Sequence, residues 1–78
     1  MKLELYKRDT CPYCQRVMAV IDQLGSPVEM HDIERNPADL ERLVAVGGKR
    51  QVPCLFIDGQ PLYESADIIQ WLQANRDL

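Results

Sequence analysis

The spacing of hydrophobic positions changes after the first ten residues. The apolar run around Leu3, Leu5 and Tyr6 ends at Asp9-Thr10, which predicts a strand followed by a turn. The next apolar residues recur at three- and four-residue spacing, with polar residues between them: Val17, Met18, Ile21 and Leu24. Gly25 then ends a predicted helix over residues 12–24.

The next two predicted elements are a strand and a helix. Residues 28–33 predict a strand, and the helix before it is long enough for a right-handed crossover back to the first strand. Asn36 before Pro37 is typical of a helix start. The apolar stripe that follows ends at Gly47-Gly48 and predicts the second helix.

The last third of the chain predicts a hairpin and a helix. Residues 52–57 read as a central strand, and Asp58-Gly59 predicts a tight turn into an edge strand that contains Pro61. Ser65 is expected to cap a final helix, whose apolar face would pack into the core: Ile68, Ile69, Trp71 and Leu72. The order βαβαββα predicts an α/β fold, a four-stranded mixed sheet flanked by three helices. Residues 1–78 are expected to form one domain.

Composition and charge narrow the possible functions. The chain has 46% hydrophobic and 27% charged residues, as expected for a folded globular protein. A net charge of -3 argues against nucleic acid as a partner. Charges interrupt every apolar stretch, and the first ten residues do not resemble a signal peptide. We therefore expect a cytoplasmic, monomeric protein with no membrane partner.

Two of the three cysteines, Cys11 and Cys14, lie at the start of the first predicted helix. Their spacing places both sulfurs on one face, within reach of a disulfide. Unpaired N–H groups and the helix dipole would stabilise a thiolate at an exposed Cys11, while Cys14 lies one turn deeper. Arg8 would add a nearby positive charge. We expect Cys11 to attack disulfides and Cys14 to resolve the product.

A zinc half-site or a pair of buried structural cysteines would have the same spacing. Zinc would need two more ligands, and the candidates Cys54 and His31 lie far along the chain on different predicted strands. The sequence of strand, Cys-x-x-Cys and helix favours redox chemistry. We interpret Cys54 as a small buried residue, although its neighbour Pro53 leaves a place near the other sulfurs open. His31 is expected at the surface of an edge strand.

The run Cys11-Pro12-Tyr13-Cys14 resembles the dithiol active site of glutaredoxins more than the Cys-Gly-Pro-Cys of thioredoxins. Val52-Pro53 is similar to the segment that carries a cis-proline in this superfamily. Gln51 stands where glutaredoxins usually have threonine, and Glu64-Ser65 followed by Asp67 is similar to glutathione S-transferase N-terminal domains. The resemblance covers essentially the whole chain. It implies a thioredoxin-like (glutaredoxin) fold with transferase-like features.

A glutathione site needs backbone pairing in its middle and charge-matched groups at both ends. The resemblance implies that the backbone of Val52 pairs with the tripeptide, and that the γ-glutamyl carboxylate lies at the helix start near Glu64-Ser65. Either Glu64 or Asp67 would meet the amine. The expected binding residues are Arg8, Tyr13, Gln51, Val52, Pro53, Glu64 and Ser65, with Lys49 and Arg50 as further candidates for the glycine carboxylate. Each of these residues also has an interpretation without a ligand. Ser65 would only cap the helix, the cations would be solvated side chains, and Tyr13 would only cover the cysteines.

The resemblance implies glutathione-dependent reduction of protein disulfides and glutathione mixed disulfides. Glutathione would be the co-substrate, glutathionylated or disulfide-containing proteins the partners, and no metal is expected. One alternative is a [2Fe-2S] cluster shared by two chains through Cys11 and two glutathiones, although the strongest carriers have a single cysteine. The other is a transferase-like N-terminal domain with a helical partner domain. Met1 before the first strand and the short end after the last helix argue against it.

Overall fold

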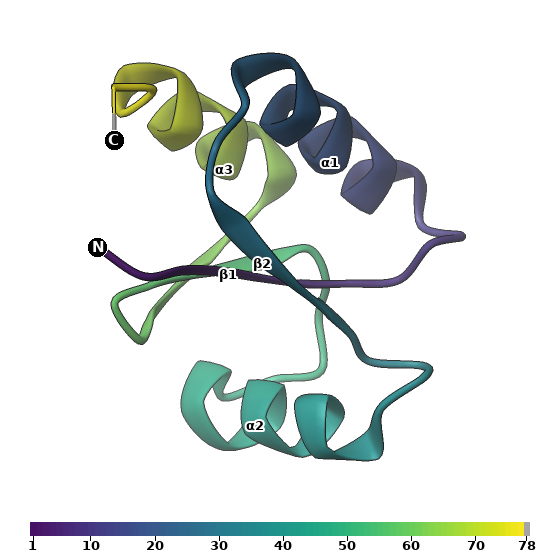
Figure 1. Cartoon of the computed structure of the whole chain (residues 1–78). Coiled ribbons are helices and arrows are strands. Elements are labelled where there is room, and N and C mark those ends of the chain that lie inside the picture. Colours follow the sequence, from purple (N-terminus) through teal and green to yellow (C-terminus); the bar gives the residue numbers. More distant parts are fainter. Residues whose placement is uncertain (78) are drawn as a thin grey trace.

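The computed structural model describes residues 1–77, and its elements follow the predicted order (Figure 1). The strands are β1 (Leu3–Lys7), β2 (Val28–Asp32), β3 (Cys54–Ile57) and β4 (Gln60–Tyr63). The helices are α1 (Pro12–Leu24), α2 (Pro37–Gly47) and α3 (Ser65–Ala74). The sheet order is β2-β1-β3-β4, with β1 parallel to β2 and antiparallel to β3. The predicted α/β fold with a mixed, thioredoxin-like sheet is confirmed.

The sheet separates two hydrophobic clusters. Helices α1 and α3 cover one face and α2 covers the other (Figure 1). Because side chains alternate along a strand, Leu3 and Leu5 of β1 pack against α1 and α3, whereas Tyr6 packs on the α2 side. Both faces of the central strands are therefore covered by helices.

The predicted hairpin turn and the predicted ends of the first two helices are found. The side chain of Asn36 accepts a hydrogen bond from the amide of Ala38 at 3.1 Å and caps α2. Asp58 and Gly59 both have positive φ, 49° and 83°, as a tight hairpin turn requires. The strand containing Pro61 lies at the edge of the sheet, where a missing N–H costs no ladder bond. The predictions from the sequence are confirmed at these positions.

Two predicted boundaries were wrong in ways that affect the site. The third strand begins at Cys54 instead of residue 52, because Pro53 has no N–H to extend the ladder; the Val52-Pro53 peptide is cis. Ser65 does not cap α3. Glu64 holds that position with φ 72° and no side-chain cap, so Ser65 is the first helical residue. A smaller difference is that β2 ends at residue 32 instead of 33.

None of the helices within residues 1–77 is long and apolar enough to cross a membrane.

Candidate active site

The local backbone at the start of α1 holds Cys11 over the first helical turn. Cys11 is the N-cap residue, with extended dihedral angles, and Pro12 is the first helical residue. The sulfur of Cys11 accepts a hydrogen bond from the amide of Cys14 at 3.3 Å. The carbonyl of Cys11 accepts from the amide of Gln15 at 2.9 Å. A sulfur thus occupies the place that a serine or aspartate oxygen usually takes at a helix N-terminus.

Cys11 is more enclosed than the sequence led us to expect. Its exposed fraction is only 6%, so the prediction of an exposed thiol was wrong, whereas Cys14 is fully buried as predicted. The reason is the cap geometry, which folds the Cys11 side chain back over the first turn of the helix. Only a small part of the Cys11 side chain is therefore open to solvent.

The surroundings of Cys11 stabilise a thiolate. Burial on its own would raise the pKa of Cys11, but hydrogen bonds from Cys14 and from the Tyr13 amide, together with the Arg8 charge, hold that pKa below its usual value. Burial and the neighbouring Cys11 sulfur raise the pKa of Cys14 to about 12. The two thiols therefore differ in the way that an attacking and a resolving cysteine must differ.

A groove of about 400 Å³ lies beside this helix start. Its volume is in the range of small-molecule sites. Residues from the first turn of α1, from the loop before β3 and from the start of α3 line it: Tyr13, Gln51, Val52, Pro53, Glu64 and Ser65. Except for Arg8, these are the residues that the sequence predicted for glutathione. The structure brings them together in one groove.

At the α3 side of the groove, Glu64 has a positive φ of 72°, which non-glycine residues rarely adopt. The side chain of Gln51 donates a hydrogen bond to the Glu64 carboxylate at 3.3 Å. Asp67 instead lies on a separate concave surface with Leu62 and Trp71. Of the two acidic residues that the sequence left open, Glu64 is the one in the groove.

A second hollow of about 250 Å³ continues from the groove, because Gln51 and Val52 line both. Arg8 and Arg50 contribute two cationic side chains to it, and Ile33, which sequence reasoning did not single out, forms part of its wall. Lys49, the other candidate cation, is not among the residues lining either hollow. Its Nζ lies over the ring of Tyr63, 4.4 Å from the centroid. The combined groove thus has an acidic end and a basic end.

Cys54 belongs to the other side of the molecule. It packs with Tyr6 and Phe56 in the cluster on the α2 face, whereas α1 packs on the opposite face of the sheet. Cys54 is fully buried, and this burial raises its pKa to about 11. The interpretation of Cys54 as a buried core residue is confirmed. Neither Cys11 nor Cys14 belongs to this cluster.

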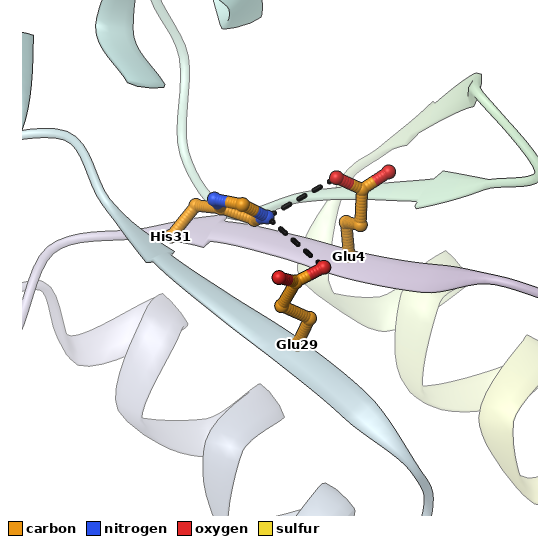
Figure 2. A group of neighbouring side chains, drawn as sticks. All are labelled: Glu4, Glu29 and His31. Atoms are coloured by element: carbon orange, nitrogen blue, oxygen red, sulfur yellow. Dashed lines mark ion pairs between the residues drawn. The ribbon is translucent and has the colours of Figure 1, made fainter. Parts of the chain in front are cut away.

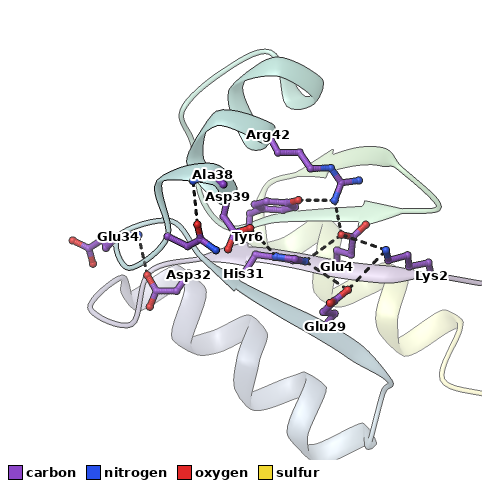
Figure 3. Close-up of polar contacts among 11 residues, drawn as sticks. Lys2, Glu4, Tyr6, Glu29, His31, Asp32, Glu34, Ala38, Asp39 and Arg42 are labelled. Carbon is purple, nitrogen blue, oxygen red and sulfur yellow. Dashed lines mark hydrogen bonds and ion pairs between the residues drawn. The ribbon is translucent and has the colours of Figure 1, made fainter.

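His31 is on an edge strand as predicted, but its side chain is only 17% exposed, so the prediction of a surface side chain was wrong. Its ring stacks on Tyr6, 4.8 Å between centroids. Nearby, Arg42 donates hydrogen bonds to Glu4 at 2.6 Å and to the Tyr6 hydroxyl at 2.9 Å (Figure 3). Sequence reasoning missed this network. The sequence feature that could have indicated it is Glu4 between Leu3 and Leu5, because a glutamate on a strand covered on both faces needs a charged partner.

Comparison with known proteins places this chain in a family. The family model of the glutathione S-transferase N-terminal domain matches residues 5–78. Glutaredoxin 3 of Escherichia coli (strain K12) is 36% identical over 58 residues, which is 74% of this chain and 70% of that protein. A probable glutaredoxin of Synechocystis is 34% identical over 68 residues, 86% of this chain and 77% of that protein.

A solved structure of a glutathione transferase is also similar to this chain. Glutathione transferase Omega 3C from Trametes versicolor superposes with a TM-score of 0.82 at 25% identity, over 95% of this chain and 33% of that one. The chain thus spans about a third of the transferase. These matches define a thioredoxin-fold protein of the thiol-disulfide oxidoreductase class. The chain belongs to the glutaredoxin family and carries features of glutathione S-transferase N-terminal domains.

Proposed function

We propose that this protein is a glutathione-dependent oxidoreductase that reduces protein disulfides and glutathione mixed disulfides, with Cys11 as the attacking group. The observation that carries the proposal is the contrast between the two thiols. The pKa of Cys11 is held below its usual value at the helix start, and burial and the nearby Cys11 sulfur raise the pKa of Cys14 to about 12. Of these two thiols, Cys11 is therefore the one whose thiolate form is favoured.

The reaction follows from ordinary thiol-disulfide exchange. The Cys11 thiolate attacks the glutathionyl sulfur of a mixed disulfide, a new Cys11–glutathione disulfide forms, and the substrate leaves as a thiolate. The thiolate of a second glutathione then attacks the glutathionyl sulfur of this intermediate. Oxidised glutathione is released, and Cys11 leaves as a thiolate. With a protein disulfide, Cys11 forms a mixed disulfide with the protein. Cys14 then attacks the Cys11 sulfur, which releases the reduced protein and leaves a Cys11–Cys14 disulfide. Two glutathiones later reduce this internal disulfide.

The groove supports a particular orientation of glutathione. The tripeptide would lie along Val52 beside the cis-Pro53. Its γ-glutamyl amine would meet the Glu64 carboxylate and its γ-glutamyl carboxylate the first turn of α3, where backbone N–H groups are unpaired. The glycine carboxylate would lie toward Arg8 and Arg50 in the adjoining hollow. Charges at both ends are then matched.

The experiment that tests the function is a coupled assay of glutathione-dependent reduction of a glutathionylated peptide. We expect activity in the wild type, loss of activity in Cys11→Ser, and retention in Cys14→Ser, because resolution by Cys14 is not needed when glutathione is the second thiol. Cys54→Ser is the matched control for loss of a buried thiol. An active Cys11→Ser protein would refute the proposal.

A second candidate function is activation of glutathione for attack on an electrophile, as the match to the transferase N-terminal domain suggests. It would use the same groove but would not consume a disulfide. Conjugation of glutathione to an aryl halide, measured beside the reduction assay, separates the two activities. Cytoplasmic location, a monomeric state and one domain over residues 1–78 stay predictions.

A further inference from the structure

Three potential metal ligands from two neighbouring strands meet on the sheet, apart from the cysteine pair. Figure 2 shows Glu4 of β1 with Glu29 and His31 of β2, and their donor atoms all lie within 4.8 Å of one another. His31 Nε2 is 3.1 Å from Glu4 Oε2 and 3.7 Å from Glu29 Oε2. The parallel pairing of β1 with β2 places Glu4 opposite Glu29, so the backbone itself sets this arrangement.

Asp39 determines which nitrogen of His31 carries the proton. Its Oδ1 lies 3.0 Å from His31 Nδ1 (Figure 3). An ionised carboxylate only accepts hydrogen bonds, so Nδ1 must be the donor. In the neutral imidazole, Nε2 then has a lone pair that faces the other two carboxylates. A histidine whose distal nitrogen is held by a carboxylate is the usual arrangement behind a metal ligand.

The remaining nitrogen has no partner of its own. His31 Nε2 is buried and forms no hydrogen bond with the described residues 1–77, although two carboxylate oxygens lie near it. The Glu4 side chain, which points toward it, is itself only 2% exposed. In the neutral form of His31, the Nε2 lone pair and the two carboxylate oxygens repel one another until a cation, either a proton or a metal ion, lies between them.

We propose that Glu4, Glu29 and His31 form a binding site for Zn²⁺. Zinc takes imidazole nitrogen and carboxylate oxygen at about 2.0–2.2 Å, which in a tetrahedral site separates ligand atoms by about 3.3–3.6 Å. The two measured separations from Nε2, 3.1 and 3.7 Å, lie close to this range. Glu29 is 57% exposed at its side chain and is free to adjust. Water would be the fourth ligand.

The neighbouring cations are compatible with the ion. Arg42 donates to Glu4 Oε2 and orients this carboxylate from the side of α2. Lys2 Nζ lies 4.0 Å from both glutamates, but its side chain is 66% exposed, and such a pair contributes little. Glu4, Glu29 and Asp39 outnumber Arg42 and Lys2, so a cation is electrostatically favoured. Mg²⁺ prefers a purely oxygen-based, octahedral shell and would not be held.

The test is calorimetric titration of Zn²⁺ into protein in which Cys11 and Cys14 are joined as a disulfide, so that their thiolates cannot bind the metal. We expect one equivalent of Zn²⁺ bound, at least tenfold weaker binding in Glu29→Gln, and unchanged binding in Glu34→Gln, an exposed glutamate outside the cluster. Mg²⁺ should give no binding heat. Because Glu29 is exposed, its variant is expected to fold.

Two further measurements separate ligation from a merely structural effect. Asp39→Asn should weaken Zn²⁺ about 10- to 100-fold, because it removes the partner that fixes the His31 tautomer. Co²⁺ should give visible absorption without sulfur charge-transfer bands. The proposal is overturned if the disulfide form binds no Zn²⁺ at millimolar concentration, or if Glu29→Gln binds it as tightly as the wild type. It does not depend on the oxidoreductase activity, whose loss would leave it standing.

Discussion

The amide nitrogen of Cys14 lies 3.3 Å from the sulfur of Cys11 and donates to it. This contact affects the two cysteines differently. It stabilises negative charge on Cys11, and the same first turn buries Cys14 completely. A negatively charged sulfur accepts a stronger hydrogen bond than a neutral thiol does, so the contact favours ionisation of Cys11. The difference between the thiols is therefore built into the N-terminus of α1.

The first prediction concerns Arg8 and the pH dependence of Cys11. The Arg8 charge is one of the effects that lower the pKa of Cys11 below its usual value, so Arg8→Ala should raise that pKa. Arg8 is exposed, and we expect a shift of about 0.2–0.7 pH unit, the equivalent of an exposed ion pair. The measurement is the rate of alkylation by iodoacetamide as a function of pH, made in Cys14→Ser protein. Arg8→Ala should shift the midpoint of this profile to higher pH by the same amount. Arg76→Ala is the matched control, and an equal shift there would contradict the interpretation.

The second prediction concerns stability in alkali. Burial raises the pKa of Cys54 to about 11, from a usual value of 9.0. Above pH 9 the unfolded chain loses this proton while the folded chain keeps it, so the free energy of unfolding should fall as the pH rises from 9 to 11. Cys14, with a pKa of about 12, acts in the same direction.

Urea unfolding at pH 7, 9 and 10.5 measures this effect. Cys54→Val should show a smaller decrease between pH 9 and 10.5 than the wild type, because one of the buried titrating thiols is gone. The comparison is made within each protein, so a change in stability at pH 7 does not affect it. Equal decreases in the two proteins would show that Cys54 titrates normally.

The third prediction distinguishes the two acidic residues near α3. Glu64 lies in the groove with Gln51, whereas Asp67 lies on another surface. Glu64→Gln should raise the KM for glutathione about 10- to 150-fold, the equivalent of losing one charge-assisted hydrogen bond. Its kcat should be nearly unchanged. Asp67→Asn is the matched control and should leave the KM near the wild-type value; the reverse result would move the amine site to Asp67.

Much of the fold follows from the sequence because local signals and global pairing agree. Asn36, Asp58 and Gly59 each mark a turn or cap by their own chemistry, and the structure has the cap or turn at each position. All six residues that line the groove were also predicted, because they lie at the ends of predicted elements, where the resemblance to glutaredoxins places the ligand.

The misses have physical causes that a single sequence does not display. A serine before a helix is a good cap, but here Glu64, with a positive φ, takes the N-cap position, so Ser65 becomes the first helical residue. Cys11 is covered because its side chain folds over α1, which no spacing reveals. The cluster of Glu4, Glu29 and His31 depends on strand register, and Asp39 reaches it from α2. Contacts between elements thus account for most of what was missed.

The most direct test of the account is to trap the intermediate on Cys11. Cys14→Ser protein, incubated with oxidised glutathione and analysed by mass spectrometry of the intact chain and its peptides, should carry one glutathionyl group on Cys11. Wild-type protein should instead accumulate the internal Cys11–Cys14 disulfide, and Cys11→Ser should carry no group. An adduct on Cys54, or a Cys14→Ser protein that forms no mixed disulfide, would contradict the assignment of Cys11 as the attacking thiolate.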